Sequence, residues 1–261
     1  MTLPLAGLVV VVTRPAAQAA RFAGLVTAAG AQPLLLPTLE IDTLELDADA
    51  RSRLVPDAFD WTIYTSANAV DASLRQLPRP QRTKVAAVGR ATARALEQHG
   101  IAVSAVPSTT ADSEGLLELE CFADLRGRRV LILKGRGGRT LLREELARRG
   151  AEVVLGDVYE RRQAEATPGV LEELRRACDA GRAVIAATSA EVLAALLELA
   201  PAERSPRLRD AALLVPGERV AAAARSHGWR GRIVIAPSAE DAAMADALGR
   251  AFAGASRPGA A

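Results

Sequence analysis

The sequence is poor in the residues that most often carry metal or thiol chemistry. Its 261 residues include only two cysteines and two histidines. Cys121 and Cys178 lie far apart, without a CxxC spacing or a neighbouring histidine, so we expect two small core residues and neither a metal site nor a disulfide. His99 and His227 each precede a glycine, which predicts that they cap helices. Proton transfer would then need a tyrosine, a carboxylate or a bound water.

The sequence also lacks a long apolar run, a large net charge and almost all lysine. No stretch of about 20 apolar residues is present, so we expect no membrane span. The first residues lack the basic region of a signal peptide and predict a strand, which favours a cytoplasmic protein. The formal net charge of +2 gives no indication of nucleic acid binding. Lys84 and Lys134 are the only lysines among 33 basic residues. This is typical of a codon bias, although arginine also suits carboxylate ligands.

What the sequence does contain is an internal repeat with a period of domain size. Its members are Gly7–Thr13 with Gly127–Leu133, Gly30-Ala31 with Gly150-Ala151, Thr65–Ala67 with Thr188–Ala190, and His99-Gly100 with His227-Gly228. Such a period indicates a duplicated domain and not a solenoid. Two like lobes predict a cleft between them, where ligands usually bind.

Short apolar runs alternate with amphipathic segments along the whole chain. This pattern predicts an α/β fold with parallel sheets covered on both faces. The expected strands lie near 8–13, 32–36, 61–65, 84–88, 102–106, 129–133, 152–155, 183–188, 212–216 and 233–236. Five strands in each lobe is the flavodoxin-like count.

The order of the repeated segments predicts how the lobes are connected. Gly7–Pro37 matches Gly127–Val158, but the Thr65–Leu117 block comes before Gly127 while its companion, Thr188–Ala247, lies near the end. The simplest arrangement inserts lobe two after the second strand of lobe one. Lobe one then comprises 1–36 and 163–261, and lobe two comprises 40–158. The chain crosses between the lobes near 37–41 and near 156–162, as a paired hinge that permits closure.

Ligands in open α/β sheets bind beyond the carboxyl ends of the strands, where helix N-termini present free amides. The loops at these places are rich in glycine, serine and threonine. Each such residue alone is explained as a helix cap, but six such loops together favour binding of an anion. The candidates in these loops are Thr13, Arg14, Thr65, Ser66, Asn68, Gly89, Thr92, Lys134, Gly135, Arg136, Ser189 and Gly217.

The chemical motifs of several enzyme classes are missing. Leu133–Thr140 has neither the GxxxxGK[ST] nor the GxGxxG spacing, so we expect no nucleotide site, although a basic turn there can hold a carboxylate. HExxH and GxSxG are also absent. Of the two tyrosines, Tyr64 is expected to be buried in a strand. Tyr159 lies on the second crossing, where it either faces the cleft or packs in the core or the hinge.

At these residues the chain resembles the uroporphyrinogen-III synthase family, through most of its length to about Phe252. Each motif is weak alone, and the likeness rests on their order and spacing. The motifs are Val12–Pro15, Tyr64–Val70, Ala87–Ala93, Asp112–Leu117, Val158–Arg161, Ala187–Ala190 and Val215–Gly217. The resemblance implies two flavodoxin-like lobes with parallel sheets, one inserted in the other and joined by a two-stranded connector.

The resemblance also implies a reaction without cofactor or metal. Its substrate would be the linear tetrapyrrole hydroxymethylbilane, which loses water and closes with ring D inverted, through a spiro intermediate, to uroporphyrinogen III. Tyr159 matches a tyrosine thought to assist departure of the hydroxyl, a general-acid role. Thr92, Ser113 and Ser189 match binding positions of the family. The second copy of the Gly-x-x-Thr-Ala motif carries Val220 in place of threonine, so Val220 receives no role.

Two other interpretations stay open at this point. A two-lobed module that senses an acidic small molecule would use the same loops. A nucleotide-sugar transferase would need a phosphate loop, which the sequence lacks, or a DxD metal site. No nucleic acid or membrane partner is expected, and a monomer is the default.

Overall fold

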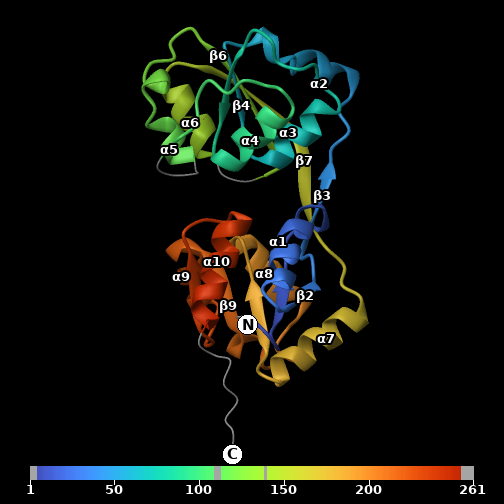
Figure 1. The fold of residues 1–261 in the computed structure, drawn as a ribbon. Helices are drawn as coiled ribbons and strands as arrows, with labels where there is room; N and C mark the ends of the chain where they lie inside the picture. Colours follow the sequence, from blue (N-terminus) through green and yellow to red (C-terminus); the bar gives the residue numbers. More distant parts are fainter. Residues whose placement is uncertain (1–4, 109–112, 138–139, 254–261) are drawn as a thin grey trace, which may run out of the picture. The chain divides into compact units, whose positions relative to one another are not determined.

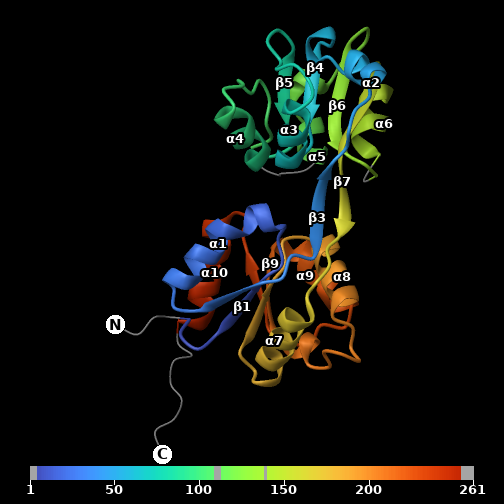
Figure 2. The ribbon, with the colours of Figure 1, turned by 90° about the vertical axis from the view of Figure 1, so that its right-hand side faces the viewer.

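The computed structural model describes residues 5–108, 113–137 and 140–253 and is an α/β protein with two sheets of five strands (Figures 1 and 2). It divides into two compact units. Unit 1 combines Met1–Glu40 with Arg162–Ala261, and unit 2 is the continuous segment Ile41–Arg161. The boundaries fall inside β3 (Leu39–Thr43) and β7 (Glu152–Gln163), so the chain passes from one unit to the other within strands. No helix in the described ranges is long and apolar enough to cross a bilayer.

The sheet of unit 1 has the order β10-β9-β8-β1-β2, and all neighbouring strands in it are parallel. Its strands are β1 (Val9–Val12), β2 (Gln32–Leu35), β8 (Ala183–Ala186), β9 (Ala212–Pro216) and β10 (Ile233–Ala236). Successive side chains of β1 point to opposite faces. Val10 and Val12 pack with α1 and α10, and Val9 and Val11 pack with α7, α8 and α9. These helices are α1 (Ala16–Ala28), α7 (Pro168–Asp179), α8 (Ala190–Leu199), α9 (Gly217–Ser226) and α10 (Asp241–Phe252).

Unit 2 repeats this arrangement with the order β3-β7-β6-β4-β5. Its further strands are β4 (Trp61–Tyr64), β5 (Lys84–Ala87) and β6 (Arg129–Gly135), and its helices are α2 (Ala48–Arg53), α3 (Ala67–Leu74), α4 (Arg90–Gln98), α5 (Ser113–Leu117) and α6 (Leu141–Arg148). One face of the sheet packs with α3 and α4, the other with α5 and α6. Val9 lies opposite Gln32 in unit 1, and Arg129 lies opposite Glu152 in unit 2. The sequence repeat is therefore also a repeat of strand pairing.

The prediction that both sheets are wholly parallel is wrong at β3. Leu44 donates its N–H to Val158 O, and Ala164 donates its N–H to Thr38 O, both at 3.0 Å. One residue number rises as its partner's falls, so β3 and β7 are antiparallel. The sequence pattern missed β3 and ended β7 at 155, because this ribbon carries charged residues such as Glu160 and does not cover a core in the way β1 does.

The strand expected at 102–106 is reduced to a single parallel bridge between Ala86 and Ala105. Ala87 donates to Ala105 O and Ser104 donates to Val85 O, but the pairing goes no further. Pro107 follows directly and has no N–H to extend a ladder. The count of five strands in unit 2 is therefore reached with β3 in place of 102–106.

The histidines and one of the cysteines lie where the sequence predicts. His99 and His227 are the C-cap residues of α4 and α9, which confirms their capping role. Cys178 is buried in the core of unit 1, and burial raises the pKa of its thiol to about 12, so it stays protonated. The prediction of a core position is wrong for Cys121, which is exposed on the short 3-10 helix Glu120–Phe122.

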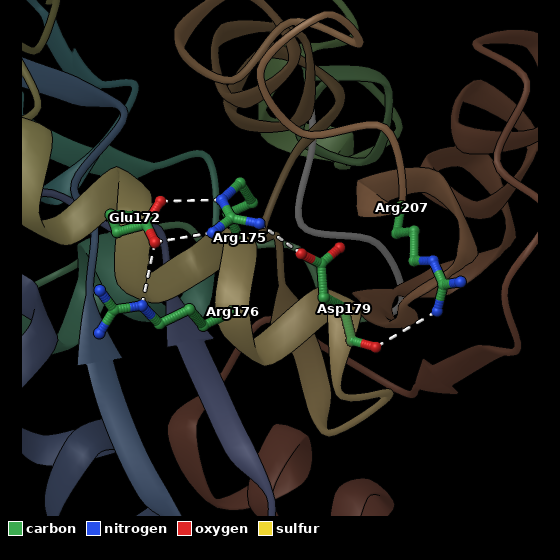
Figure 3. Close-up of polar contacts among 5 residues, drawn as sticks. All are labelled: Glu172, Arg175, Arg176, Asp179 and Arg207. Atoms are coloured by element: carbon green, nitrogen blue, oxygen red, sulfur yellow. Dashed lines mark hydrogen bonds and ion pairs between the residues drawn. The ribbon is translucent and has the colours of Figure 1, made fainter.

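The outer face of α7 is an ion-pair chain that is satisfied within itself (Figure 3). Glu172 accepts hydrogen bonds from Arg175 and Arg176, and Arg175 also donates to Asp179. These two arginines hold the pKa of Glu172 at about 2. Arg207 donates to the carbonyl oxygen of Asp179 at 3.2 Å. The guanidinium groups of this face are thus engaged with neighbours, and we do not assign them to a ligand.

Candidate active site

Tyr159 lies within β7, beside the carboxyl end of β6, where the pairing of the two strands is irregular. The register shifts between Lys134 and Gly135, so that Gly135 lies opposite Tyr159. The tyrosine ring packs directly over this glycine. A Cβ on Gly135 would lie only 2.6 Å from Tyr159 Cζ. The side chain of Tyr159 is 1% exposed and belongs to the core of unit 2, so the prediction that it packs inside is the one that holds.

Ser66 joins Tyr159 from the end of β4, which is separated from β7 by β6. It is the N-cap of α3, and its Oγ accepts a hydrogen bond from Ala69 N at 3.1 Å. The same Oγ lies 3.1 Å from Tyr159 Oη. Because β4, β6 and β7 are parallel, the part of β7 that carries Tyr159 lies at the edge of the sheet where β4 and β6 end. This brings two residues that are 93 positions apart into hydrogen-bonding contact.

Arg161 completes the cluster from the same strand as Tyr159. Its Nη2 donates to Tyr159 Oη at 2.9 Å, and its guanidinium lies 5.3 Å from the centre of the tyrosine ring. Residues two apart on a strand share a face, which accounts for the contact. The two side chains differ in exposure, because Arg161 is exposed where Tyr159 is buried. Ser66, Tyr159 and Arg161 are called the hydroxyl cluster below.

The basic loop after β6 is used mainly to hold its own shape. Lys134 Nζ donates to the carbonyl oxygens of Gly135 at 2.7 Å and Gly137 at 2.5 Å, and to Asp157 at 3.1 Å. An ammonium group has three donors, so all three are occupied. Arg136 also forms an internal ion pair, with Glu160 at 2.7 Å, but its side chain remains exposed. The expected carboxylate clamp at Lys134 therefore lacks a free donor.

The other candidates of unit 2 lie at or beside the starts of helices. The hydroxyl of Thr65 donates to Leu133 O at 3.3 Å, and Asn68 lies in the first turn of α3. Gly89 is the N-cap of α4, which has no side-chain cap, and Thr92 is buried in its first turn. Ser113 begins α5, and its neighbour Asp112 lies outside the described residues. The N-cap residue of α4 thus brings no side chain to the first amides of the helix, an arrangement that suits an anion.

Two candidates of unit 1 are occupied by the fold. Thr13 is fully buried and donates to Ala186 O at 2.7 Å, so its hydroxyl secures the sheet. The guanidinium of Arg14 pairs with Asp241, donates to Ala239 O at 3.1 Å, and lies 4.8 Å from the ring centre of Phe22. A ligand carboxylate at Nη1 of Arg14 would have to replace Asp241, whereas Arg14 Nε is buried and has no hydrogen-bond partner among the described residues.

The remaining two candidates of unit 1 show where the repeats agree and where they differ. Ser189 is the N-cap of α8 and accepts from Val192 N at 3.1 Å, as Ser66 does from its own helix. Gly217, the counterpart of Gly89, has φ of +77°, whereas Gly89 is extended at −159°. Only Gly217 therefore requires a glycine for its backbone. Val220 is buried in the core of unit 1, in keeping with its lack of a role.

Comparison with known proteins identifies the family of this chain. A model of the family described as uroporphyrinogen-III synthase HemD matches residues 20–246, most of the chain. The uroporphyrinogen-III synthase of Salmonella typhimurium is 35% identical over 195 residues, which cover 72% of this chain and 78% of that protein. The chain belongs to the uroporphyrinogen-III synthase family. The family and the enzymatic character predicted from the sequence motifs are confirmed.

Other members of the uroporphyrinogen-III synthase family agree in sequence and in fold. The Escherichia coli enzyme is 35% identical over 62% of this chain and 65% of its own length. A crystal structure of a mutant uroporphyrinogen III synthase from Thermus thermophilus aligns with a TM-score of 0.63 at 22% identity, covering 94% of this chain and 98% of that one. The Helicobacter pylori enzyme gives 0.59 at 18% identity, covering 92% and 97%. The α/β fold with two five-stranded sheets is thus a fold of this family.

Sequence reasoning in this uroporphyrinogen-III synthase family member missed one member of the hydroxyl cluster. Arg161 was part of the Val158–Arg161 motif, yet it was not selected as a site residue. The available signal was strand alternation, which places residues 159 and 161 on one face. That signal was hidden because the strand was expected to end at 155.

Gly135 gives a prediction about how Tyr159 is placed. We expect Gly135→Ala to lower turnover at least about 10-fold, because the new Cβ would push the tyrosine ring out of hydrogen-bonding range of Ser66. Steady-state rates of the variant measure this. The control is Gly169→Ala in α7, where a Cβ meets nothing within 4 Å. Turnover equal to wild type in Gly135→Ala would show that the ring tolerates displacement.

Proposed function

We propose that this chain converts hydroxymethylbilane to uroporphyrinogen III, with loss of water and inversion of ring D through a spiro intermediate. The family membership supports the reaction. The hydroxyl cluster supports a place for its first step, because it puts an O–H donor next to a cation at a strand end. That step is departure of the substrate hydroxyl, and the electron-rich pyrrole beside it supplies most of the driving force.

We infer that the architecture consists of two flavodoxin-like lobes, one inserted in the other and joined by a two-stranded connector. The strand order supports this inference. Numbered along the chain, β2-β1-β8-β9-β10 of unit 1 reads 2-1-3-4-5, which is the flavodoxin-like order. In unit 2 the corresponding strands β7-β6-β4-β5 follow the same order from a permuted start. The antiparallel β3 and β7 correspond to the connector.

We infer that the substrate carboxylates bind at helix N-termini in preference to charged side chains. The substrate carries eight carboxylates, whereas Thr13, Arg14 and Lys134 are occupied by internal contacts. The amides at the starts of α4 and α9 lack side-chain caps. Each such contact contributes roughly 0.3–1 kcal/mol at an exposed site. Several together would fix the shape of a flexible substrate, and correct positioning of the reacting rings accounts for much of the rate.

The isomer ratio of the product tests the proposed function. Freshly prepared hydroxymethylbilane closes without enzyme to the isomer with ring D not inverted. We expect the protein to turn most of the substrate into uroporphyrinogen III at a rate proportional to its concentration, as measured by chromatographic separation of the oxidised isomers. Only the uninverted isomer, as in the blank, would refute the proposal.

A further inference from the structure

The burial of Tyr159 raises a specific question about the route of its proton. The side chain is 1% exposed, so its hydroxyl has almost no surface on which a substrate can sit. Ser66, by contrast, is half-exposed at the start of α3. A general acid must be within hydrogen-bonding reach of the atom that it protonates. Ser66 is exposed enough to lie within hydrogen-bonding reach of a ligand. Tyr159 lies within hydrogen-bonding reach of Ser66.

The other hydrogen bonds of the cluster indicate which of Ser66 and Tyr159 donates to the other. Tyr159 Oη accepts a hydrogen bond from Arg161. If Ser66 also donated to Tyr159, the phenol proton would have no acceptor among the described residues and would be buried. An unsatisfied buried donor costs about 1–3 kcal/mol. The favoured arrangement therefore has Tyr159 donating to Ser66.

The same reasoning leaves the O–H donor of Ser66 without an acceptor among the described residues. A serine hydroxyl has two acceptor lone pairs and one donor. One lone pair of Ser66 accepts from Ala69 N, and the other accepts from Tyr159 Oη. Its O–H has no acceptor among the described residues. The donor is therefore available to a ligand at the half-exposed surface, and it is directly connected to a buried second proton.

On the basis of the proposed function, we propose that Ser66 delivers the proton of Tyr159 to the leaving hydroxyl of the substrate. The C–O bond of the hydroxymethyl group breaks, and its electron pair goes to the oxygen. That oxygen takes the proton of Ser66 Oγ and leaves as water, while Ser66 takes the proton of Tyr159 Oη. The pyrrole nitrogen supplies electrons to the methylene carbon and keeps its proton, giving the protonated azafulvene. The proton released when ring D regains aromaticity at the end returns to the tyrosine by the same path.

Arg161 serves this relay as a positioning residue. Its donation to Tyr159 Oη occupies the phenol oxygen from one side, which directs the phenol proton to Ser66. The guanidinium also lies beside the negative charge that remains on the oxygen after proton transfer, and charge-assisted hydrogen bonds are about twice as strong as neutral ones. Without Arg161, the tyrosine would keep its place in the core but lose this direction.

Three substitutions at Ser66 separate proton delivery from helix capping. Ser66→Ala removes the hydroxyl and the cap, and loss of such a cap typically costs about 1 kcal/mol. Ser66→Gly removes the hydroxyl but costs the helix only a few tenths of a kcal/mol. Ser66→Thr keeps both functions. We expect the alanine and glycine variants to lose at least about 10-fold in kcat with KM within about 2-fold, and threonine to restore most of it. If kcat of these variants followed the stability of α3 and not the presence of the hydroxyl, the relay would be overturned.

Combination with Tyr159→Phe gives the decisive measurement. If both hydroxyls act in series, Ser66→Gly should have almost no further effect on kcat in a Tyr159→Phe background. Equal factors in the two backgrounds would mean that the residues act independently, which overturns the proposal. Arg161→Met should likewise lose its effect in that background, and Arg162→Met, a neighbouring arginine paired with Glu40, should change little in either. Failure of the proposed function is seen separately, since wild type would then yield no uroporphyrinogen III.

Discussion

Replacing Tyr159 by phenylalanine is expected to lower the rate of uroporphyrinogen III formation about 100-fold while the protein stays folded. Proton donation to a leaving group contributes roughly 10²–10⁴-fold where it operates. Phenylalanine keeps the ring that packs over Gly135 and removes only the hydroxyl bonded to Ser66 and Arg161. Loss of two hydrogen bonds should lower the free energy of unfolding by only about 1–3 kcal/mol.

The measurement needs a control for removal of a buried tyrosine hydroxyl, and the chain offers one. Tyr64 is the other tyrosine of the sequence and belongs to the same core of unit 2. Burial raises the pKa of its phenol, an effect that the neighbouring Ser73 partly offsets, and Tyr64 is not a member of the hydroxyl cluster. We expect Tyr64→Phe to keep turnover within about 2-fold of wild type. Unchanged turnover in Tyr159→Phe would remove Tyr159 from the mechanism, without affecting the family assignment.

Replacing Gly231 by alanine is expected to produce a large loss of stability. A Cβ there would lie 1.9 Å from Ala211 O and 2.6 Å from Asp210 O. Both are backbone atoms, and Ala211 O accepts the hydrogen bond of the Trp229 indole at 2.9 Å. Relief of the clash would disturb that bond and the packing around it. We expect the free energy of unfolding of unit 1 to fall by about 3 kcal/mol.

Gly249 provides the matched control, a glycine at which alanine should raise the free energy of unfolding. It lies inside α10, and a Cβ there meets nothing within 4 Å. Alanine is a better helix residue than glycine, so Gly249→Ala should stabilise by about 0.5–1 kcal/mol. Urea unfolding followed by Trp229 fluorescence, in a Trp61→Phe background, reports on unit 1 alone. A Gly231→Ala protein as stable as wild type would mean that the loop around Ala211 moves without cost.

The sequence predicted best those features that depend on local pattern. Val9–Val12 and its counterparts are apolar because both faces of the strand are covered, and such runs are recognisable. Ser66 and Ser189 could be expected as caps from their repeated Thr-Ser-Ala context. By contrast, 102–106 has the same apolar character but finds only one bridge, because pairing depends on distant chain segments. The antiparallel β3 was missed because its pattern is mixed.

Site prediction had a different weakness. The sequence shows which residues carry donors but not whether the fold already uses them. The charge of Lys134 and Arg14 makes both candidates for ligand binding, yet they form ion pairs with Asp157 and Asp241. Tyr159 was selected by resemblance. The contact that gives it a route for its proton depends on the order β7-β6-β4.

The antiparallel contact between Thr38 and Ala164 has a consequence for the order of folding. These two residues bond at 3.0 Å although the whole of unit 2 lies between them in the chain. Closing so long a loop is entropically unfavourable, and the cost grows with loop length. Unit 2 is continuous and is synthesised before β8, β9 and β10, the strands that β1 and β2 need for their sheet. Its early folding shortens the open loop to a few residues. The strands β1 and β2 therefore cannot complete their sheet, and their apolar faces stay uncovered, until the last third of the chain has been synthesised.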